Sequence, residues 1–367
     1  MKVYVDVYLA KNLGDDLFVD ILAKKFPKID FVVNYYGAEY DAFFNRYDNL
    51  NKSYYPFIYR ILNKLKIYDY INDTKRISDN YDAYIFLGGS IFREESDYWE
   101  SLYYHRLKIV EEFEKKEKPV FILGANFGPY ITQDFFDKYF FLFSKCHDIC
   151  FRDSYSKELF KNLDNVRYEA DIIFQFDIEK NVENSNIIGY SLIEPKHKYD
   201  LKKYRNSYMN TIVQSVNRNI NAGKQCVFFS FCKKEGDTNI CKEIYGKLSK
   251  LNQTKVQIVE YDGDIQNFIS HFNKCEMIIA CRFHANILGI LAGIRVIPFV
   301  YSQKTVNVLK DVNFNDLIFS IKNDILLDVN EDSKFKIQVQ DIDKIQESSR
   351  RQFKMLEEFF DKRMCIK

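Results

Sequence analysis

The sequence has almost no excess charge, since its 367 residues include 53 Lys and Arg against 52 Asp and Glu. These charges are interspersed, and no basic domain or stripe of the kind that binds nucleic acid is present. No apolar run approaches the roughly 18 residues needed to span a membrane. The sequence therefore excludes nucleic acid as a partner and predicts at most peripheral contact with a membrane.

The spacing typical of a metal site is also missing. The eight cysteines are not paired as in a zinc site, and the loose CxxxC of Cys146 and Cys150 fits buried thiols better than metal ligands. The first residues, MKVYVDVYLAKN, predict a strand and contain neither the charged nor the apolar region of a signal peptide. We therefore expect no metal, no cofactor and reduced thiols in a cytoplasmic protein, with the inner face of the membrane left open as its location.

Length and periodicity indicate an α/β protein with two domains. Apolar residues make up 47% of the chain, and 367 residues are long for one core. Short apolar runs alternate with longer amphipathic ones, which is typical of βαβ units and a mainly parallel sheet. Strands are predicted near 2–8, 29–33, 83–87, 119–123, 148–151, from 187, and near 225–229, 256–259, 276–280, 295–300 and 317–320. Helices are predicted over 15–25, much of 54–66, 97–116, 132–145, 154–163, 200–221 and 341–362.

The alternation of strands and helices stops over a polar stretch and restarts at Ile187. We therefore predict two doubly wound, Rossmann-like domains, residues 1–178 and 186–335, with a crevice between them. Ligands of open α/β sheets bind outside the carboxyl ends of the strands, so polar residues that follow strands are candidates for the site.

Four turns in the first half have glycine or polar residues at such strand ends. They are NLGDD (12–16), FLGGS (86–90), LGANFGP (123–129) and FRDSYS (151–156). Each alone is ordinary strand–helix geometry, and none is a complete GxGxxG motif or a P-loop. Their recurrence at successive strand ends favours one lined crevice, in which an acceptor would be bound from the first domain. The candidate contacts are Asn12, Gly14, Asp15, Asp16, Gly89, Ser90 and Asn126, with Asp15 as a helix N-cap.

The second half contains the most informative stretch, IIACRFHANILGILAGIRVIPFVYSQKT (278–305). It predicts strand, turn, helix, strand and then a loop that ends in Lys304. A lone histidine on an apolar face usually fills a core, but Arg282 beside His284 and the downstream Lys304 argue against that interpretation.

Two further charged stretches leave alternatives open. In SFCKKEGD (230–237), Glu235 and Asp237 can accept hydrogen bonds from sugar hydroxyls, while a solvated loop explains them equally well. The basic stretch Lys196–Arg205 is typical of a solvated helix face, with an anionic lipid or a diphosphate as the less favoured partner.

Taken together, these motifs resemble those of the polysaccharide pyruvyl transferases, bacterial enzymes that place a pyruvate ketal on cell-surface sugars. The resemblance is based on NLGDD, FLGGS, LGANFGP, FRDSYS and CRFHANILGILAGIRVIPFVYSQKT, in this order, and extends over about residues 11 to 305. It implies a GT-B-like fold with the terminal helix 341–362 packed back towards the first domain. Nothing in the segment Tyr35–Asp82 matches the family.

The resemblance also implies the chemistry. The donor would be phosphoenolpyruvate, and the acceptor a hexose or N-acetylhexosamine of a capsular or exopolysaccharide repeat unit, with a lipid-diphosphate-linked form left open. By position, the catalytic residues would be Arg152, which binds the donor, His284 and Lys304, with Arg282 as a further contact. Phosphoenolpyruvate approaches three negative charges, so a near-neutral protein needs local Arg and Lys to bind it.

Two other functions remain as alternatives. A GT-B nucleotide-sugar glycosyltransferase would bind a diphosphate with Arg282 and Lys304 and a ribose with Glu235. A non-catalytic sugar-binding member of a polysaccharide assembly is the second, although three costly polar groups in an apolar crevice argue against it.

Overall fold

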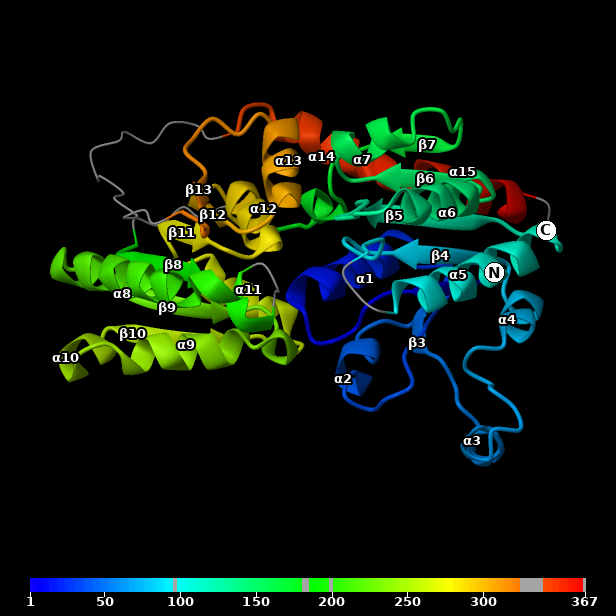
Figure 1. Cartoon of the computed structure of the whole chain (residues 1–367), viewed down its shortest axis with the longest axis horizontal. Coiled ribbons are helices and arrows are strands. Elements are labelled where there is room, and N and C mark those ends of the chain that lie inside the picture. Colours follow the sequence, from blue (N-terminus) through cyan, green and yellow to red (C-terminus); the bar gives the residue numbers. More distant parts are fainter. Residues whose placement is uncertain (95–97, 180–184, 198–200, 324–338, 366–367) are drawn as a thin grey trace. The chain divides into compact units, whose positions relative to one another are not determined.

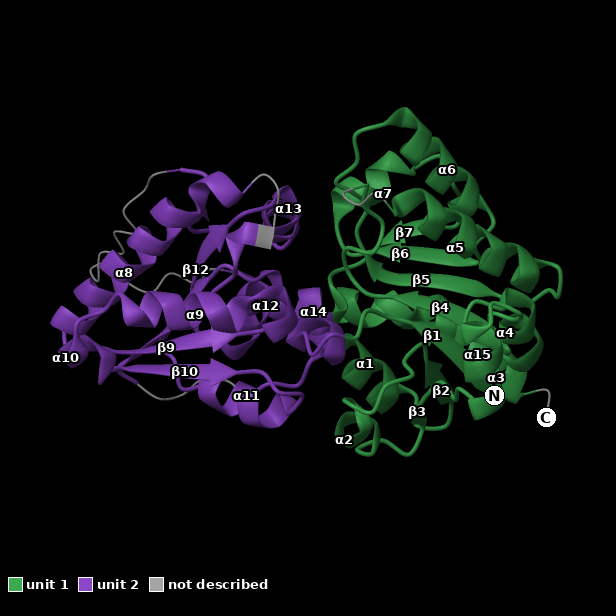
Figure 2. Ribbon diagram, turned by 60° about the horizontal axis from the view of Figure 1, so that its bottom comes forward, with its two compact units in different colours: residues 1–9, 18–172, 347–367 green, residues 10–17, 173–346 purple. Residues whose placement is uncertain are grey.

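The computed structural model describes residues 1–94, 98–179, 185–197, 201–323 and 339–365. The chain forms two compact units, which are coloured separately in Figure 2. Unit 1 contains Met1–Leu9, Phe18–Ile172 and Glu347–Lys367, and unit 2 contains Ala10–Leu17 and Ile173–Gln346. Among the described residues, no helix is both long and apolar enough to cross a bilayer.

Unit 1 is built on a seven-stranded parallel sheet (Figure 1). Its order is β3-β2-β1-β4-β5-β6-β7, the Rossmann arrangement with its switch point between β1 and β4. The strands are β1 (Lys2–Asp6), β2 (Asp30–Val33), β3 (Leu50–Lys52), β4 (Ala83–Leu87), β5 (Val120–Ala125), β6 (Asp148–Phe151) and β7 (Val166–Tyr168). The central strands are buried on both faces, which is why they are continuous apolar runs in the sequence.

Helices cover both faces of the unit 1 sheet. On one face, α5 (Trp99–Glu114) and α6 (Gln133–Ser144) pack a core of aromatic and aliphatic side chains against β4, β5 and β6. On the other face, Phe353 and Phe360 make edge-to-face contacts with Phe26, and Phe360 also with Phe31 of β2. The remaining helices are α1 (Leu13–Lys25), which begins in unit 2, α2 (Asp41–Phe44), α3 (Phe57–Lys64), α4 (Thr74–Asn80) and α7 (Ser154–Leu159).

Unit 2 has a six-stranded parallel sheet with the same pattern of order, β10-β9-β8-β11-β12-β13. Its switch point lies between β8 and β11. The strands are β8 (Ile187–Ser191), β9 (Gln225–Ser230), β10 (Val256–Glu260), β11 (Met277–Ala280), β12 (Arg295–Val300) and β13 (Phe319–Ser320). The helices are α8 (Arg205–Asn221), α9 (Asp237–Gly246), α10 (Lys250–Gln253), α11 (Ile265–Phe272), α12 (Phe283–Ala292) and α13 (Gln303–Asp311). The α/β class with two Rossmann-like units is confirmed.

The predicted domain limits differ from the observed units in two places. Residues 10–17 were expected in the first domain but belong to unit 2. The long segment of unit 1 that starts at Phe18 ends at Ile172, whereas the first domain was expected to extend to residue 178. The predicted limit at 335 lies outside the described residues. The predicted helix 341–362 is two helices, α14 (Ile342–Arg350) and α15 (Lys354–Met364), with a 3-10 turn between them, and its part from Glu347 belongs to unit 1.

Candidate active site

Arg282 is the centre of an ion-pair cluster at the carboxyl edge of the unit 2 sheet. Its backbone N–H donates to Ser191 Oγ at 3.1 Å, which joins the ends of the two strands at the switch point. Its Nε donates to Asp237 Oδ2 at 2.8 Å and its Nη1 to Glu235 Oε2 at 2.7 Å, and Nη2 also contacts Asp237. Burial alone would lower the pKa of Arg282, but these carboxylates hold it well above its usual value. The guanidinium is therefore charged and fixes the loop 231–237 to the start of α12.

These contacts give Asp237 a different role from the expected one. Its carboxylate is 0% exposed, because it accepts from Arg282 and from the backbone N–H of Cys232 at 3.0 Å. It therefore holds Arg282 and the loop, and offers no surface to a sugar hydroxyl. Glu235 is partly exposed, and its role as a sugar contact stays a prediction. Arg282 is likewise only 7% exposed and engaged by carboxylates, and its role as a substrate contact stays a prediction.

The segment 10–17 packs on the same edge of unit 2. Leu13 N–H donates to Phe231 O at 3.1 Å, and Asn12 forms an antiparallel bridge with Cys232. The Asn12 amide also reaches Glu235 at 3.4 Å, and Tyr261 donates its hydroxyl proton to Asp16 at 2.7 Å. NLGDD is thus part of the unit that contains His284. Asp15 lies in the first turn of α1, which begins at Leu13, and not at the predicted N-cap.

Gly14 leaves the space that the His284 ring occupies. A Cβ at position 14 would lie 1.6 Å from His284 Nδ1 and 2.3 Å from its Cε1. A larger residue would therefore displace the ring, so this close approach requires glycine. The fold therefore brings together two of the predicted site residues, Gly14 and His284, from distant parts of the sequence.

His284 and Lys304 lie in the first turns of two neighbouring helices. The first helix, α12, follows β11 and the second, α13, follows β12, and these strands pair in parallel. Lys304 therefore lies on a helix rather than at the end of the predicted loop. Its Nζ is 6.0 Å from the centre of the Phe283 ring, which is itself 4.8 Å from the His284 ring. Backbone N–H groups at such helix starts favour anions, and an ammonium group beside them adds to this preference.

Two hydroxyls at the start of α13 were not identified from the sequence. Within the described part of the chain, the buried hydroxyl oxygens of Ser302 and Thr305 have no hydrogen-bond partner. Ser302 occupies the N-cap position of α13 without capping it through its side chain. Both hydroxyls can donate to an oxyanion beside Lys304. The signal in the sequence was the string SQKT directly after an apolar strand.

The cysteines near this edge are not nucleophiles. Burial raises the pKa of Cys232 to about 12, and burial likewise raises the pKa of Cys281 to about 12. Both thiols are therefore protonated at neutral pH, and a thiolate mechanism is not supported.

Unit 1 contains a second polar cluster, centred on Arg152. The side chain is 2% exposed at the end of β6; its Nη1 donates to Asp171 Oδ2 at 3.0 Å and its Nη2 to Asn126 Oδ1 at 2.7 Å. Ser90 donates to the same Asn126 oxygen at 3.0 Å. A Cβ at Gly89 would lie 2.6 Å from Arg152 Nη1, so this glycine allows the FLGGS turn to cover the guanidinium. The structure therefore brings four of the predicted site residues into one cluster in unit 1: Gly89, Ser90, Asn126 and Arg152.

Two residues of the C-terminal segment, Ser349 and Gln352, form hydrogen bonds to the backbone beside the Arg152 cluster. Ser349 donates to the backbone oxygen of Asp171 at 2.6 Å. The buried Gln352 accepts from Gly124 N–H at 3.1 Å and donates to the backbone oxygens of Phe151 and Glu169. These two residues were not predicted, because their partners lie far away in the sequence. Asp153 caps α7 by accepting from Ser156 N–H at 2.8 Å.

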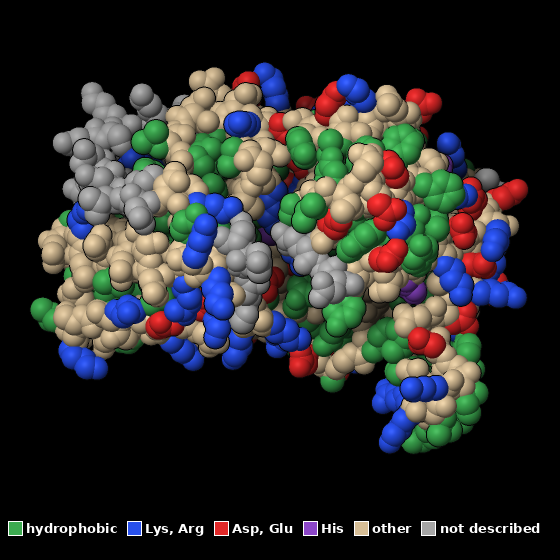
Figure 3. Space-filling model, viewed as in Figure 1, with side chains coloured by type: hydrophobic (Ala, Val, Ile, Leu, Met, Phe, Trp, Pro, Cys, Tyr) green, Lys and Arg blue, Asp and Glu red, His purple; other side chains and the backbone are tan. Residues whose placement is uncertain are grey.

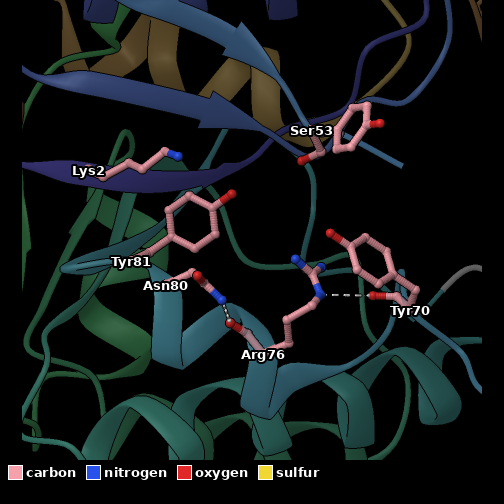
Figure 4. A pocket seen from close by; sticks show the side chains of 7 residues that line it. Lys2, Ser53, Tyr70, Arg76, Asn80 and Tyr81 are labelled. Carbon is pink, nitrogen blue, oxygen red and sulfur yellow. Dashed lines mark hydrogen bonds between the residues drawn. The ribbon is translucent and has the colours of Figure 1, made fainter. Parts of the chain in front are cut away.

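One pocket of unit 1 lies away from the Arg152 cluster (Figure 4). It has a volume of about 200 Å³ and adjoins Lys2, the first residue of β1, whereas that cluster follows the carboxyl ends of strands. Its lining residues are Lys2, Ser53, Tyr54, Tyr70, Arg76, Asn80 and Tyr81. The described residues contain no group of three or more His, Cys, Asp or Glu side chains that could bind a metal ion.

The fold is of the GT-B-like class and resembles solved structures of sugar-nucleotide proteins. Anabaena HepE, solved in complex with UDP and glucose, is 10% identical over 99% of this chain and 100% of its own, with a TM-score of 0.59. A UDP-GlcNAc 2-epimerase from Methanocaldococcus jannaschii is 12% identical over 97% of this chain and 99% of its own, with a TM-score of 0.55. At such identity these likenesses concern the fold alone.

The family follows from the sequence match. The family model for polysaccharide pyruvyl transferase matches residues 12–303, which include both polar clusters. This chain belongs to the polysaccharide pyruvyl transferase family, and the resemblance stated from its motifs is confirmed. The predicted convergence of Arg152 with Arg282, His284 and Lys304 involves both units and stays a prediction.

Proposed function

We propose that this protein transfers the pyruvyl group of phosphoenolpyruvate to a sugar of a cell-surface polysaccharide repeat unit and forms a cyclic ketal. The observation that supports this best is the carboxyl edge of unit 2. There His284, in the first turn of α12, lies against Gly14, and Lys304 lies in the first turn of α13. Membership in the polysaccharide pyruvyl transferase family supports the same reaction class.

The proposed donor site is the start of α13. Lys304, the backbone N–H groups of this first turn and the hydroxyls of Ser302 and Thr305 form a set of donors without a carboxylate among them. Such a set suits the phosphate or the carboxylate of phosphoenolpyruvate. The acceptor is a hexose or an N-acetylhexosamine, and the reaction takes place in the cytoplasm.

The proposed reaction balances without a redox partner. A proton adds to the methylene carbon of phosphoenolpyruvate and leaves an oxocarbenium-like centre at C2. One sugar hydroxyl adds to C2 and loses its proton, the bond from C2 to the phosphate oxygen breaks, and a second hydroxyl closes the ring as it loses its proton. One of these two protons balances the proton gained by carbon, and the other leaves with phosphate.

His284 is the proposed general acid, or the group that stabilises the departing phosphate. General acid–base help of this kind typically contributes about 10²–10⁴ in rate. Arg152 is the proposed second cation of the donor site, as the family resemblance implies. Within unit 1, Asp171 and Asn126 hold the guanidinium in place. Ser90 of the FLGGS turn, which donates to Asn126, is the proposed contact of the acceptor.

The test is a comparison of donors with one acceptor mixture. Wild-type protein is incubated with phosphoenolpyruvate or with UDP-sugars, and the release of phosphate or UDP is followed, with the product examined by NMR for a ketal carbon. We expect phosphate release and a ketal only with phosphoenolpyruvate. UDP release with sugar transfer would instead establish a glycosyltransferase, and turnover of neither donor with any acceptor would favour a sugar-binding protein.

A further inference from the structure

The helix α3 in unit 1 exposes an unusually apolar face for a surface helix. Within α3, all of which the structure describes, no residue is buried. Phe57 is 74% exposed, Ile58 57%, Ile61 41%, and Leu65 directly after the helix 61%. At the helical repeat these four side chains fall within an arc of roughly 100°. Figure 3 shows hydrophobic and basic side chains together over α3, at the position of its label in Figure 1.

A cluster of tyrosines fixes the other side of α3. The ring of Tyr59 stacks on Tyr70 at 4.5 Å, and Tyr70 also stacks with Tyr55 at 5.7 Å. Arg60 Nε donates to Tyr55 O at 3.1 Å, and the Arg76 guanidinium lies 3.9 Å from the centre of the Tyr70 ring. These contacts hold the polar and aromatic side of α3 against its neighbours. The apolar side of the helix is therefore left exposed to solvent.

From residue 49 to residue 68 the charged side chains are all basic, although Lys52 pairs with Asp41 and Tyr68 donates to Asp73 beside this stretch. Residues 49–68 contain Lys52, Arg60, Lys64 and Lys66 and neither Asp nor Glu. Two copies of this face would bring like charges together, whereas an anionic lipid surface complements them. Apolar and aromatic side chains beside Lys and Arg on a helix too short to span a bilayer are typical of helices that lie in the membrane interface.

We propose that α3 binds the surface of an anionic lipid bilayer, with Phe57, Ile58, Ile61 and Leu65 inserted among the acyl chains. Lys64 and Lys66 then lie at the level of the phosphates. This inference goes beyond the proposed function and does not rest on it. It would keep the enzyme beside acceptors that are anchored in a membrane.

The pocket of Figure 4 adds positive charge at the base of this helix. Tyr70, which stacks on Tyr59 of α3, also lines the pocket together with Lys2 and Arg76. No Asp or Glu is among its lining residues within the described part of the chain. The pocket therefore reinforces the preference of this region for an anionic surface.

Co-sedimentation with vesicles tests the proposal. The full chain is mixed with vesicles of phosphatidylcholine alone or with one third phosphatidylglycerol, at low and high salt. We expect binding only to the vesicles that contain phosphatidylglycerol, weakened by salt. The triple variant Ile58→Gln, Ile61→Gln, Leu65→Gln should reduce the partition at least about 10-fold, and Lys64→Gln with Lys66→Gln should remove the preference for phosphatidylglycerol.

The control carries three exposed aliphatic residues changed to Gln elsewhere, at Ile131, Leu251 and Leu317, which are 89%, 75% and 69% exposed. It should bind vesicles like the wild type. Thermal unfolding and sedimentation velocity of all variants check folding and self-association. Absence of wild-type binding, or equal loss in the control, would overturn the proposal, as would a dimer that only the α3 variant dissociates while vesicle binding is unchanged. Phosphate release with a soluble acceptor is measured separately, so failure of the proposed function is distinguishable.

Discussion

Each unit buries an arginine at a strand end beside a glycine-containing turn, but the two arginines have different surroundings. Arg282 faces two carboxylates, Asp237 and Glu235, and through Glu235 it is linked to the segment 10–17. Arg152 faces one carboxylate, Asp171, and the amide of Asn126. The difference shows that arginines at corresponding strand ends of the two units are held by different sets of partners. In unit 2 the arginine holds the edge together, and the neighbouring His284 and Lys304 are the groups proposed to act.

The largest expected effect is on the free energy of unfolding, and we expect it to differ between Arg282 and Arg152. Arg282→Ala would leave two carboxylates, one fully buried, without their cation, which typically costs about 3–5 kcal/mol. Arg152→Ala would remove the ion pair with Asp171 and the hydrogen bond to the neutral amide of Asn126, so we expect a smaller loss. Hydrogen exchange under increasing urea should detect each loss in the unit that contains the change. Arg350→Ala, at an exposed position, is the control. Equal losses for Arg282 and Arg152, or losses no larger than that of the control, would mean that the ion pairs do not hold the strand ends.

The next largest effect is expected on donor affinity, and it compares lysines at the two ends of α13. Lys304→Ala removes a charge-assisted contact of about 1.5–3 kcal/mol, so the Kd for phosphoenolpyruvate should rise about 10- to 100-fold. Lys310→Ala, in the last turn of the same helix, should leave it unchanged. Calorimetric titration measures both. A similar weakening by the two variants would show that overall charge, and not the start of α13, attracts the donor.

The two glycine turns offer a third comparison. Gly14→Ala would force the His284 ring to move, and misplacement of a reacting group by about 1 Å can lower kcat about 10²-fold. Gly89→Ala would press on Arg152 at a longer distance, 2.6 Å instead of 1.6 Å, so a smaller loss is expected. Gly246→Ala in α9, where a Cβ meets nothing within 4 Å, is the control. Steady-state kinetics with saturating donor check the order, and full activity of Gly14→Ala would refute the proposed role of the ring.

The smallest effect is expected at the edge of the unit 1 cluster. Ser90→Ala removes one hydrogen bond to Asn126, which typically contributes about 0.5–1.5 kcal/mol. We expect a rise of a few fold in the acceptor KM and no change in donor affinity. If donor and acceptor constants change together, the assignment of the FLGGS turn to the acceptor alone is wrong.

Much of the fold was predictable, because strands buried on both faces are apolar runs that are bounded by turn residues. The strands β3 and β7 were not predicted, since each has only three residues and neither is a continuous apolar run. The long terminal helix was predicted as one piece because its amphipathic pattern continues through the 3-10 turn at Arg351–Phe353.

The candidate site was predictable in its residues but not in their partners. The position of polar residues after apolar strands indicated His284 and Lys304, and the family resemblance added Arg152; their roles stay predictions. These features did not indicate that Asp237 would neutralise Arg282 or that NLGDD would pack in unit 2, since these contacts join segments 45 and more than 200 residues apart. Such pairings depend on tertiary structure, which local patterns do not contain.

The most direct test of the account separates turnover from donor binding in His284→Ala. We predict that kcat falls about 10²–10⁴-fold while the calorimetric Kd for phosphoenolpyruvate changes little, because the proposed role of the histidine lies mainly in the transition state. His284→Gln should be equally inactive, since an amide does not transfer a proton. A near-normal kcat in either variant, with lower thermal stability, would contradict the account and make His284 a residue that only fills the space beside Gly14.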